Sequence, residues 1–211
     1  MTGDWLARFK RYGAVRDGHF LLTSGLHSAT YVQSALILQY PGEATALAEA
    51  LADRVRSLQP HVVIGPALGG IIVAHEMARA LGCRALFCER VDGRMQLRRG
   101  FAVGPGERVL VVEDVVTTGG SVGEVAALVR SARGTVVGYA ALVDRRGGAD
   151  RDRTDGAARE PDPRLVALIS LDLPIFPADV CPLCRAGVPI DKPGSRSQPG
   201  VPGGREAGAA R

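Results

Sequence analysis

Lysine is nearly absent from this 211-residue chain: only Lys10 and Lys192 occur, and arginine carries almost all of the positive charge. The formal net charge is +4, an excess that does not by itself indicate a nucleic-acid surface. No apolar run approaches the roughly 18 residues of a membrane-spanning helix. The opening MTGDWLARFKRYG also lacks the cationic-then-apolar order of a secretion signal. We therefore expect a cytoplasmic protein without a membrane or nucleic-acid partner.

Cysteine is also scarce, and four cysteines in a chain of this length do not make a disulfide scaffold. Cys181 and Cys184 form a CxxC pair, but no second CxxC or matched histidine pair accompanies it. A closed tetrahedral zinc site is therefore expected to lack ligands within one chain. Structural cysteines or an incidental disulfide are favoured, while a redox pair or a metal site between subunits stays open. Cys83 and Cys88 are expected to lie in the core.

The common nucleotide-binding loops are missing, since neither GxxxxGK[ST] nor GxGxxG occurs. The chain has instead RVLVVEDVVTTGGSVGE at residues 108–124. The apolar, β-branched residues 109–112 are typical of a strand buried on both faces of a parallel sheet. Two adjacent carboxylates, Glu113 and Asp114, are expected to end this strand. A Thr/Gly/Ser turn and an apolar-periodic helix follow.

This turn predicts an anion site. Its glycines let backbone amides turn inward, its hydroxyls add donors, and the helix N-terminus adds a partial positive charge. A phosphate fits there, and the upstream carboxylates are placed for sugar hydroxyls or a phosphate-bound metal. An ordinary βα turn is the alternative, which the acidic pair disfavours. The turn consists of Thr117, Thr118, Gly119, Gly120 and Ser121.

Apolar strands alternate with amphipathic helices along the chain, which is long enough for one domain with a proper core. This order predicts an α/β fold with a mostly parallel, twisted sheet and helices on both faces. Ligands of such sheets bind at the carboxyl ends of the strands. Expected strands cover residues 61–65, 84–88, 109–112, 135–143 and 165–171, and expected helices cover residues 4–12, 43–58, 71–81 and the stretch from 122.

Three segments outside this alternation have their own patterns. Residues 18–41 suggest two strands joined by a loop that contains Ser24, Gly25, His27 and Ser28. Residues 89–106 are charged and punctuated by glycine, so we expect a loop or loose hairpin there. Polar residues 145–163 suggest a mobile excursion, and the Pro/Gly/Ser/Arg-rich residues 192–211 suggest a disordered tail after a domain of residues 1–191.

Five segments occur in an order that resembles the orotate phosphoribosyltransferases: GHFLLTSGLHSATY, GPALGG, ERVDGRMQLRRGF, VVEDVVTTGGS and VDRRGG. The acidic pair with its Thr/Gly loop resembles the phosphoribosyl-pyrophosphate (PRPP) signature of type I phosphoribosyltransferases, and SG-x-HS-x-x-Y resembles the pyrimidine enzymes. The resemblance implies the type I fold with a small N-terminal hood over the base (residues 1–40). It also implies synthesis of orotidine 5′-monophosphate from orotate and PRPP, in pyrimidine (UMP) biosynthesis, with Mg²⁺ and usually as a homodimer.

The resemblance also implies residue roles toward PRPP. Asp114 with Glu113 would hold the ribose hydroxyls, and Mg²⁺ would be bound mainly through PRPP, without direct protein ligands. Arg90 would join them as a catalytic residue on a mobile loop, residues 89–106, that completes the neighbouring subunit's site. The remaining PRPP contacts would be Val115, Val116, Thr117, Thr118, Gly119, Gly120, Ser121, Ala67, Leu68, Gly69, Gly70, Arg94, Arg98 and Arg99.

Toward orotate, the resemblance implies that Arg145 pairs with the substrate carboxylate, for which guanidinium geometry is well suited. The other orotate contacts would be Ser24, Gly25, Tyr31 and Thr117. The chain departs from the family pattern where lysines are usual: Thr23 and Gly69 stand there, and the loop holds arginines. Arginine supplies charge but cannot donate a proton at neutral pH, so a sub-branch with a different set of cations is indicated.

Two other functions remain as alternatives: a purine-type transferase, and a non-catalytic PRPP-binding regulator, for which no helix-turn-helix segment is found. The isolated histidines carry weaker signals. His27 is as consistent with a solvated loop as with a ligand contact, His75 is expected to be structural, and His19 and His61 stay unassigned. The arginines 146, 151 and 153 are expected on a solvated face.

Overall fold

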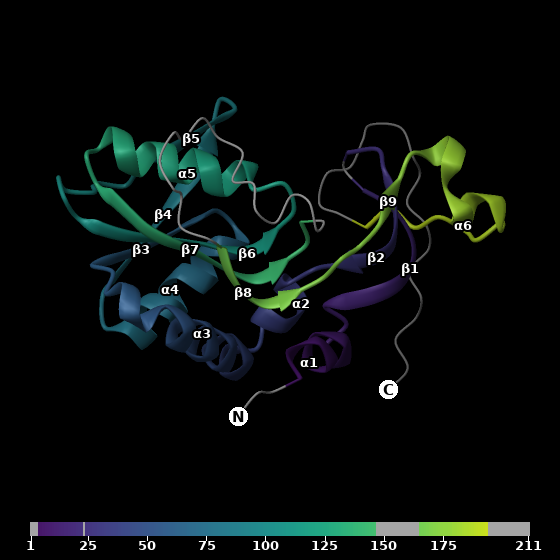
Figure 1. Ribbon diagram of the computed structural model, residues 1–211, viewed down its shortest axis with the longest axis horizontal. Helices are drawn as coiled ribbons and strands as arrows, with labels where there is room; N and C mark the ends of the chain where they lie inside the picture. Colours follow the sequence, from purple (N-terminus) through teal and green to yellow (C-terminus); the bar gives the residue numbers. More distant parts are fainter. Residues whose placement is uncertain (1–3, 23, 147–164, 194–211) are drawn as a thin grey trace.

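The computed structural model describes residues 4–22, 24–146 and 165–193. Its main body is a six-stranded sheet in the order β5-β4-β3-β6-β7-β8 (Figure 1). All neighbours are parallel except β5, which pairs antiparallel with β4. The mostly parallel sheet predicted from the sequence is confirmed. The strands are β3 (Val62–Pro66), β4 (Arg84–Val91), β5 (Arg94–Leu97), β6 (Arg108–Val116), β7 (Thr135–Asp144) and β8 (Leu165–Ser170).

Helices cover both faces of this sheet, as predicted. Helices α3 (Pro41–Val55) and α4 (Gly69–Leu81) lie on one face, and α5 (Gly120–Ser131) lies on the other (Figure 1). Two separate apolar clusters result, one under α3 and α4 and one under α5. The short η1 (Arg56–Leu58) follows α3. No helix in the described residues is both long and apolar enough to cross a membrane.

Strand β6 lies near the centre of the sheet and is longer than the sequence indicates. Its residues 109–112 are fully buried, as expected for a strand covered on both faces. The carboxylates were expected to end the strand, and that is wrong: the ladder to β7 continues through Glu113↔Ala141 to Val116↔Asp144. Glu113 and Asp114 therefore lie within the strand, because parallel pairing with β7 outweighs the polarity of two residues.

A second, antiparallel sheet has the order β1-β2-β9, from β1 (Val15–Leu21), β2 (His27–Val32) and β9 (Ile175–Phe176). It lies beside the main body (Figure 1). The expected hairpin is confirmed, and Gly25 at its tip has a φ of 81°. His27 and Ser28 lie in β2 rather than in the loop. Helix α2 (Ala35–Leu38) follows where the sequence suggested continued strand.

The termini of the described chain pack against this second sheet. Helix α1 (Trp5–Arg11) is capped by Asp4, whose side chain accepts a hydrogen bond from the Ala7 amide at 2.9 Å, a common contact at helix N-termini. The C-terminal segment contains η3 (Ala178–Val180) and α6 (Pro182–Arg185). The predicted excursion lies mostly outside the described residues, as do Arg151, Arg153 and nearly all of the predicted tail.

Candidate active site

The turns that follow β3, β6 and β7 meet at one edge of the sheet, because these parallel strands are neighbours. They carry two turns that we name after their predicted roles, the pyrophosphate turn (Ala67, Leu68, Gly69 and Gly70) and the phosphate turn (residues 117–121), together with Arg145. All three were predicted from sequence to lie at carboxyl ends of strands, where ligands of open α/β sheets bind. The sheet therefore assembles the predicted site residues from three separate stretches of chain.

Asp114 lies where β6, the pyrophosphate turn and the second sheet come together. A Cβ atom on Gly69 would overlap the Asp114 carboxylate, so only a glycine leaves room for it. The buried Ser34 hydroxyl donates a hydrogen bond to Asp114 Oδ2 from the start of α2. Ser34 is a residue that sequence reasoning missed, since nothing in its local pattern distinguishes it. These contacts fix the carboxylate at the carboxyl end of the sheet.

Glu113 is nearly buried beside Asp114, with 8% of its surface exposed. Burial is the main cause that raises the pKa of Glu113 to about 9, and the hydrogen bond and negative charge of Asp114 act in the same direction. One member of the acidic pair is therefore protonated at neutral pH.

The phosphate turn leads directly into α5. Gly119 has a φ of 83°, which an L side chain rarely adopts, and it caps the helix. The Gly120 amide donates to Thr118 Oγ1 at 3.4 Å. The amides of the first helical turn have no acceptor within the helix, so they favour an anion. Thr117 and Thr118 are exposed at this turn, in keeping with a surface that receives a phosphate.

Two of the predicted PRPP contacts, Val115 and Val116, have side chains that pack into the apolar clusters of the protein. Val116 is 3% exposed, in the apolar cluster under α5. Its carbonyl accepts a hydrogen bond from the Arg145 amide at 2.8 Å. Val115 is partly buried against the opposite cluster. The pyrophosphate turn is more open, since the Leu68 side chain is 83% exposed. Its first residue is held to the sheet, because the Ala67 amide donates to the Cys88 carbonyl at 2.7 Å.

Arg145 follows β7 and is partly buried, and the Nε atom of its guanidinium is fully buried. Its Nε atom finds no hydrogen-bond partner among the residues that the structure describes. Burial lowers the pKa of Arg145 below its usual value, and the nearby Tyr31 partly opposes this shift. Sequence reasoning assigned both residues to the orotate contacts, and the structure brings them together from β2 and β7. A guanidinium whose buried Nε has no partner in the described part of the chain is a ready partner for a carboxylate.

Arg146 differs from its neighbour and corrects one expectation. It was placed on a solvated face, but it is 5% exposed. Its Nε and Nη2 atoms each donate to Asp144 at 3.0 Å. Such a two-point pair holds the chain rigidly where it leaves β7. Arg146 therefore supports the segment that carries Arg145.

The first part of residues 89–106 forms a hairpin of β4 and β5 that carries Arg90 and Arg94, as the hairpin alternative predicted, whereas Arg98 and Arg99 follow β5. Arg90 donates to Glu124 of α5 at 2.8 Å, so this hairpin contacts the helix of the phosphate turn. Arg99 donates to Glu89 at 3.1 Å, and Arg98 lies 3.9 Å from the same carboxylate. Arg94 is exposed near the hairpin tip. These ion pairs are exposed and individually weak, so the cations are free to exchange partners.

The tip of the β1–β2 hairpin holds Ser24 and Gly25, both exposed. The Leu22 amide donates to the Leu26 carbonyl at 2.8 Å and closes the turn.

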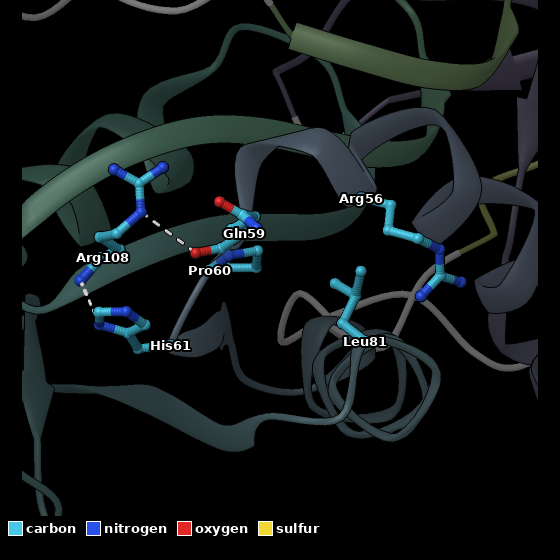
Figure 2. A pocket seen from close by; sticks show the side chains of 6 residues that line it. All are labelled: Arg56, Gln59, Pro60, His61, Leu81 and Arg108. Atoms are coloured by element: carbon cyan, nitrogen blue, oxygen red, sulfur yellow. Dashed lines mark hydrogen bonds between the residues drawn. The ribbon is translucent and has the colours of Figure 1, made fainter.

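A separate pocket lies at the opposite end of the main sheet, near the amino ends of β3 and β6 (Figure 2). There Arg108 already donates to the Gln59 carbonyl at 3.1 Å, and its amide donates to His61 Nδ1 at 3.4 Å. This pocket contains none of the predicted site residues.

The histidines and cysteines decide one open alternative and correct one expectation. His27 is buried at 6% exposure rather than solvated. His19, His27, Cys181 and Cys184 form one cluster whose ligand atoms all lie within 4.8 Å of one another. The expectation that one chain lacks ligands for a closed metal site is therefore wrong. Cys88 is buried, as expected, and Cys83 is partly buried.

Known sequences place these observations in a family. The phosphoribosyl transferase domain family matches residues 34–158. The orotate phosphoribosyltransferase of Caldicellulosiruptor bescii is 48% identical over 194 residues, which covers 92% of this chain and 97% of the relative. The orotate phosphoribosyltransferase of Pelotomaculum thermopropionicum is 51% identical over 197 residues, covering 93% of this chain and 99% of the relative.

Solved structures agree. Orotate phosphoribosyltransferase from Aeropyrum pernix superposes with a TM-score of 0.62 at 29% identity, over 78% of this chain and 92% of that one. The Mycobacterium tuberculosis orotate phosphoribosyltransferase in complex with inorganic phosphate gives a TM-score of 0.61 at 26% identity, over 81% of this chain and 95% of that one. Adenine phosphoribosyltransferase from Leishmania tarentolae has a similar TM-score of 0.62 at 18% identity, over 81% of this chain and 89% of that one, and shares the fold.

Proposed function

This chain belongs to the orotate phosphoribosyltransferases, within the phosphoribosyltransferase family, and from that premise we propose how its own residues transfer the 5-phosphoribosyl group from PRPP to orotate. The products are orotidine 5′-monophosphate and pyrophosphate, a step of pyrimidine (UMP) biosynthesis. The observation that carries the assignment of the base site is the buried Nε atom of Arg145, near Tyr31, which has no hydrogen-bond partner among the described residues. A base that carries a carboxylate can accept a hydrogen bond from this guanidinium, and a purine without a carboxylate cannot form that pair.

The phosphate turn receives the ribose 5-phosphate. Backbone amides at the start of α5, with the hydroxyls of Thr117, Thr118 and Ser121, supply donors in fixed positions. The pyrophosphate turn receives the leaving group through its own amides, since Gly69 and Gly70 allow close approach. Both turns are attached to buried strands, so the two phosphate ends of PRPP are held at a set separation. This alignment lowers the entropic part of the barrier.

Asp114 lies between these two turns and holds the ribose hydroxyls. Its carboxylate is already anchored by Ser34, so little reorganisation is needed when charge develops at the anomeric carbon. Preorganised charge of this kind is a large term in catalysis through an oxocarbenium-like state. Glu113, protonated at neutral pH, serves as a hydrogen-bonding neighbour rather than a second anion.

Magnesium fits this site through the substrate. Mg²⁺ prefers oxygen ligands and keeps several waters, binding through phosphates and one or two carboxylates. The acidic pair beside the pyrophosphate turn, in which Glu113 is protonated at neutral pH, suits a cation that PRPP itself carries, so no direct protein ligand is proposed. When bound, Mg²⁺ neutralises charge on the departing pyrophosphate. Arg90, Arg94, Arg98 and Arg99 supply further positive charge.

The segment of residues 89–106 acts as a loop that closes over pyrophosphate, and in a homodimer it completes the neighbouring subunit's site. Support comes from its exposed cations and from their weak, exchangeable ion pairs. Closure excludes water, which would otherwise hydrolyse the activated ribose. The Ser24–Gly25 turn and Tyr31 face the base from the second sheet. The enzyme works in the cytoplasm.

The test is the fall in the long-wavelength absorbance of orotate when purified protein is mixed with orotate, PRPP and Mg²⁺. We expect a fall that needs both PRPP and the metal and that adenine, hypoxanthine and uracil do not reproduce as substrates. Turnover of a purine without turnover of orotate would overturn the proposal in favour of a sister transferase. PRPP binding without turnover of any base would instead favour a non-catalytic regulator.

A further inference from the structure

Four metal-ligating side chains converge at a place that phosphoribosyl transfer does not use. His19 comes from β1, His27 from β2, and Cys181 and Cys184 from the segment around α6. Their ligand atoms all lie within 4.8 Å of one another. Three of the four side chains are buried, and Cys184 reaches the surface. Both cysteines are free thiols.

The individual separations fit a tetrahedral centre. Cys181 Sγ and Cys184 Sγ lie 3.6 Å and 3.7 Å from His19 Nε2, and Cys184 Sγ lies 3.2 Å from His27 Nδ1. Tetrahedral zinc bond lengths imply about 3.6 Å between sulfur and nitrogen ligands and roughly 3.3 Å between two nitrogens. The two ring nitrogens are 2.9 Å apart. A shift of a few tenths of an ångström therefore completes the geometry.

The outer contact of His19 aims its ring for metal binding. Its Nδ1 atom lies 2.8 Å from the Val188 carbonyl, which can only accept, so Nδ1 carries the proton. Nε2 then presents a lone pair toward His27 Nδ1 and both sulfurs. A backbone carbonyl that holds the distal nitrogen is the usual second contact of a metal-binding histidine. A cation placed among these atoms satisfies all four of them at once.

Local structure supplies the ligands in two rigid pairs. Cys181 precedes α6 and Pro182 starts it, and the Arg185 amide donates to the Cys181 carbonyl at 3.2 Å. This turn brings Cys184 back beside Cys181. In the hairpin, His27 pairs with Leu21 across the strands, and the rings of His19 and His27 have centroids 4.9 Å apart. Each half of the site is fixed by backbone hydrogen bonds.

We propose that His19, His27, Cys181 and Cys184 bind one structural Zn²⁺, with each thiol releasing its proton as its Zn–S bond forms. Two thiolates and two imidazoles favour zinc over Mg²⁺, which prefers oxygen. All four positions of a tetrahedron are filled by protein, so no position stays open for substrate or water. Such a closed site is structural rather than catalytic.

The ion would fasten the C-terminal segment to the hairpin whose tip faces the base. Other contacts already join β1 to the C-terminal segment: the Leu21 amide donates to the Asp191 carbonyl at 2.8 Å, and the Asp191 amide donates to the His19 carbonyl at 2.7 Å. Arg16 pairs with the Asp191 carboxylate at 3.0 Å, but both side chains are half-exposed, and such pairs are weak. Zinc would supply the strongest link between the two segments.

The experiment measures zinc in the full-length chain, purified with reductant and incubated with equimolar ZnCl₂ before gel filtration. We expect about one Zn²⁺ per chain by mass spectrometry of the metal. X-ray absorption should then show two sulfur and two nitrogen neighbours. The variant Cys184→Ser should lose most of the zinc, whereas Cys83→Ser and His75→Asn, which lie outside the cluster, should keep it. A chelator should lower the melting temperature of the parent protein but not that of Cys184→Ser.

Three results would overturn the proposal. One is a reduced, folded parent protein that retains no zinc after this incubation. Another is full zinc stoichiometry in a folded Cys184→Ser variant. The third is a Cys181–Cys184 disulfide, found as a loss of two hydrogens by intact mass, that persists under reductant. If Cys184→Ser fails to fold, the zinc stoichiometry and the X-ray absorption spectrum of the parent protein still decide whether the four side chains bind zinc. None of these readouts depends on phosphoribosyl transfer.

Discussion

The hydroxyl of Ser34 donates a hydrogen bond to Asp114 Oδ2 across 80 positions of sequence. Ser34 is 2% exposed and lies directly after the second sheet, while Asp114 lies in the central strand of the main sheet. The contact therefore joins the part of the molecule assigned to the base with the part assigned to the ribose. A neutral donor orients the carboxylate without cancelling its charge.

Replacement of Ser34 by alanine tests this link. The variant loses a hydrogen bond to a charged group, worth about 1.5–3 kcal/mol, so kcat/KM should fall by at least roughly tenfold. Steady-state kinetics from orotate absorbance measure this, and circular dichroism checks that the fold is retained. Ser131→Ala is the matched control, because the exposed Ser131 hydroxyl donates to the Leu128 carbonyl within α5, so the change should leave the rate unchanged. An unaltered rate in Ser34→Ala would mean that Asp114 needs no positioning.

Asp114→Asn should cut turnover by at least about 100-fold with the protein still folded, because an amide cannot stabilise positive charge at the anomeric carbon. Turnover under saturating PRPP and orotate measures the loss. Isothermal titration with PRPP shows whether ground-state binding survives. A near-normal turnover number would show that the ribose site lies elsewhere.

Glu113→Gln should behave differently from the change next to it. Glutamine resembles the protonated carboxyl, so turnover near pH 7 should change by less than about threefold, since Glu113 has a pKa of about 9. In the unfolded chain this carboxyl titrates near 4.5. Between those values the native state holds a proton that the unfolded state has released, so the free energy of unfolding falls as pH rises from 4.5 to 9.

The check is urea denaturation of both proteins across that pH range. The parent protein should lose stability toward pH 9 more steeply than Glu113→Gln, in which this contribution is absent. Parallel pH profiles for the two proteins would show that Glu113 is ionised in the native state. A collapse of activity in the glutamine variant at neutral pH would give Glu113 a role as an anion.

The main sheet and the phosphate turn could be predicted because each depends on local sequence. A run such as residues 109–112 identifies a buried strand by itself, and the alternation of strands and helices restricts their order to a parallel sheet. The carboxyl-end rule then places Asp114 and Arg145 near each other. The end of β6 was predicted wrongly from local polarity, because pairing with β7 extends this strand past Glu113 to Val116.

The remaining features depend on contacts between distant parts of the chain. The pairing of β9 with β2 joins residues almost 150 positions apart, and a strand of two residues has no periodicity to read. His19 and Cys184 meet across 165 positions. A CxxC pair alone does not reveal which histidines a hairpin will bring to it. For the same reason nothing marked Ser34 as a site residue.

Arg145→Gln should weaken orotate selectively. Loss of a charge-assisted contact should raise the KM for orotate by about 10–100-fold and leave the KM for PRPP within roughly twofold. Uracil, which lacks the carboxylate, should bind the variant and the parent protein equally weakly. Arg11→Gln on exposed α1 is the control and should change neither constant. Equal rises in both KM values would indicate a general disturbance instead of a carboxylate contact.

The close fit between Gly69 and Asp114 gives the sharpest steric prediction. In Gly69→Ala the added methyl group would overlap the Asp114 carboxylate, so either the carboxylate leaves its contact with Ser34 or the pyrophosphate turn moves outward. Both changes displace a group that binds PRPP, and a misplacement of about 1 Å can cost roughly 100-fold in rate. We expect kcat/KM for PRPP to fall by about that factor.

Gly42→Ala is the matched control, because a Cβ there meets no atom within 4 Å. Gly42 lies in the first turn of α3, where alanine should keep the rate and add a few tenths of a kcal/mol of stability. Kinetics and thermal melts of the two variants therefore separate a steric effect at the site from the general effect of replacing glycine. If Gly69→Ala retained full activity, the turn would have to be soft enough to move without cost, and its amides could not then be a preorganised cradle for pyrophosphate.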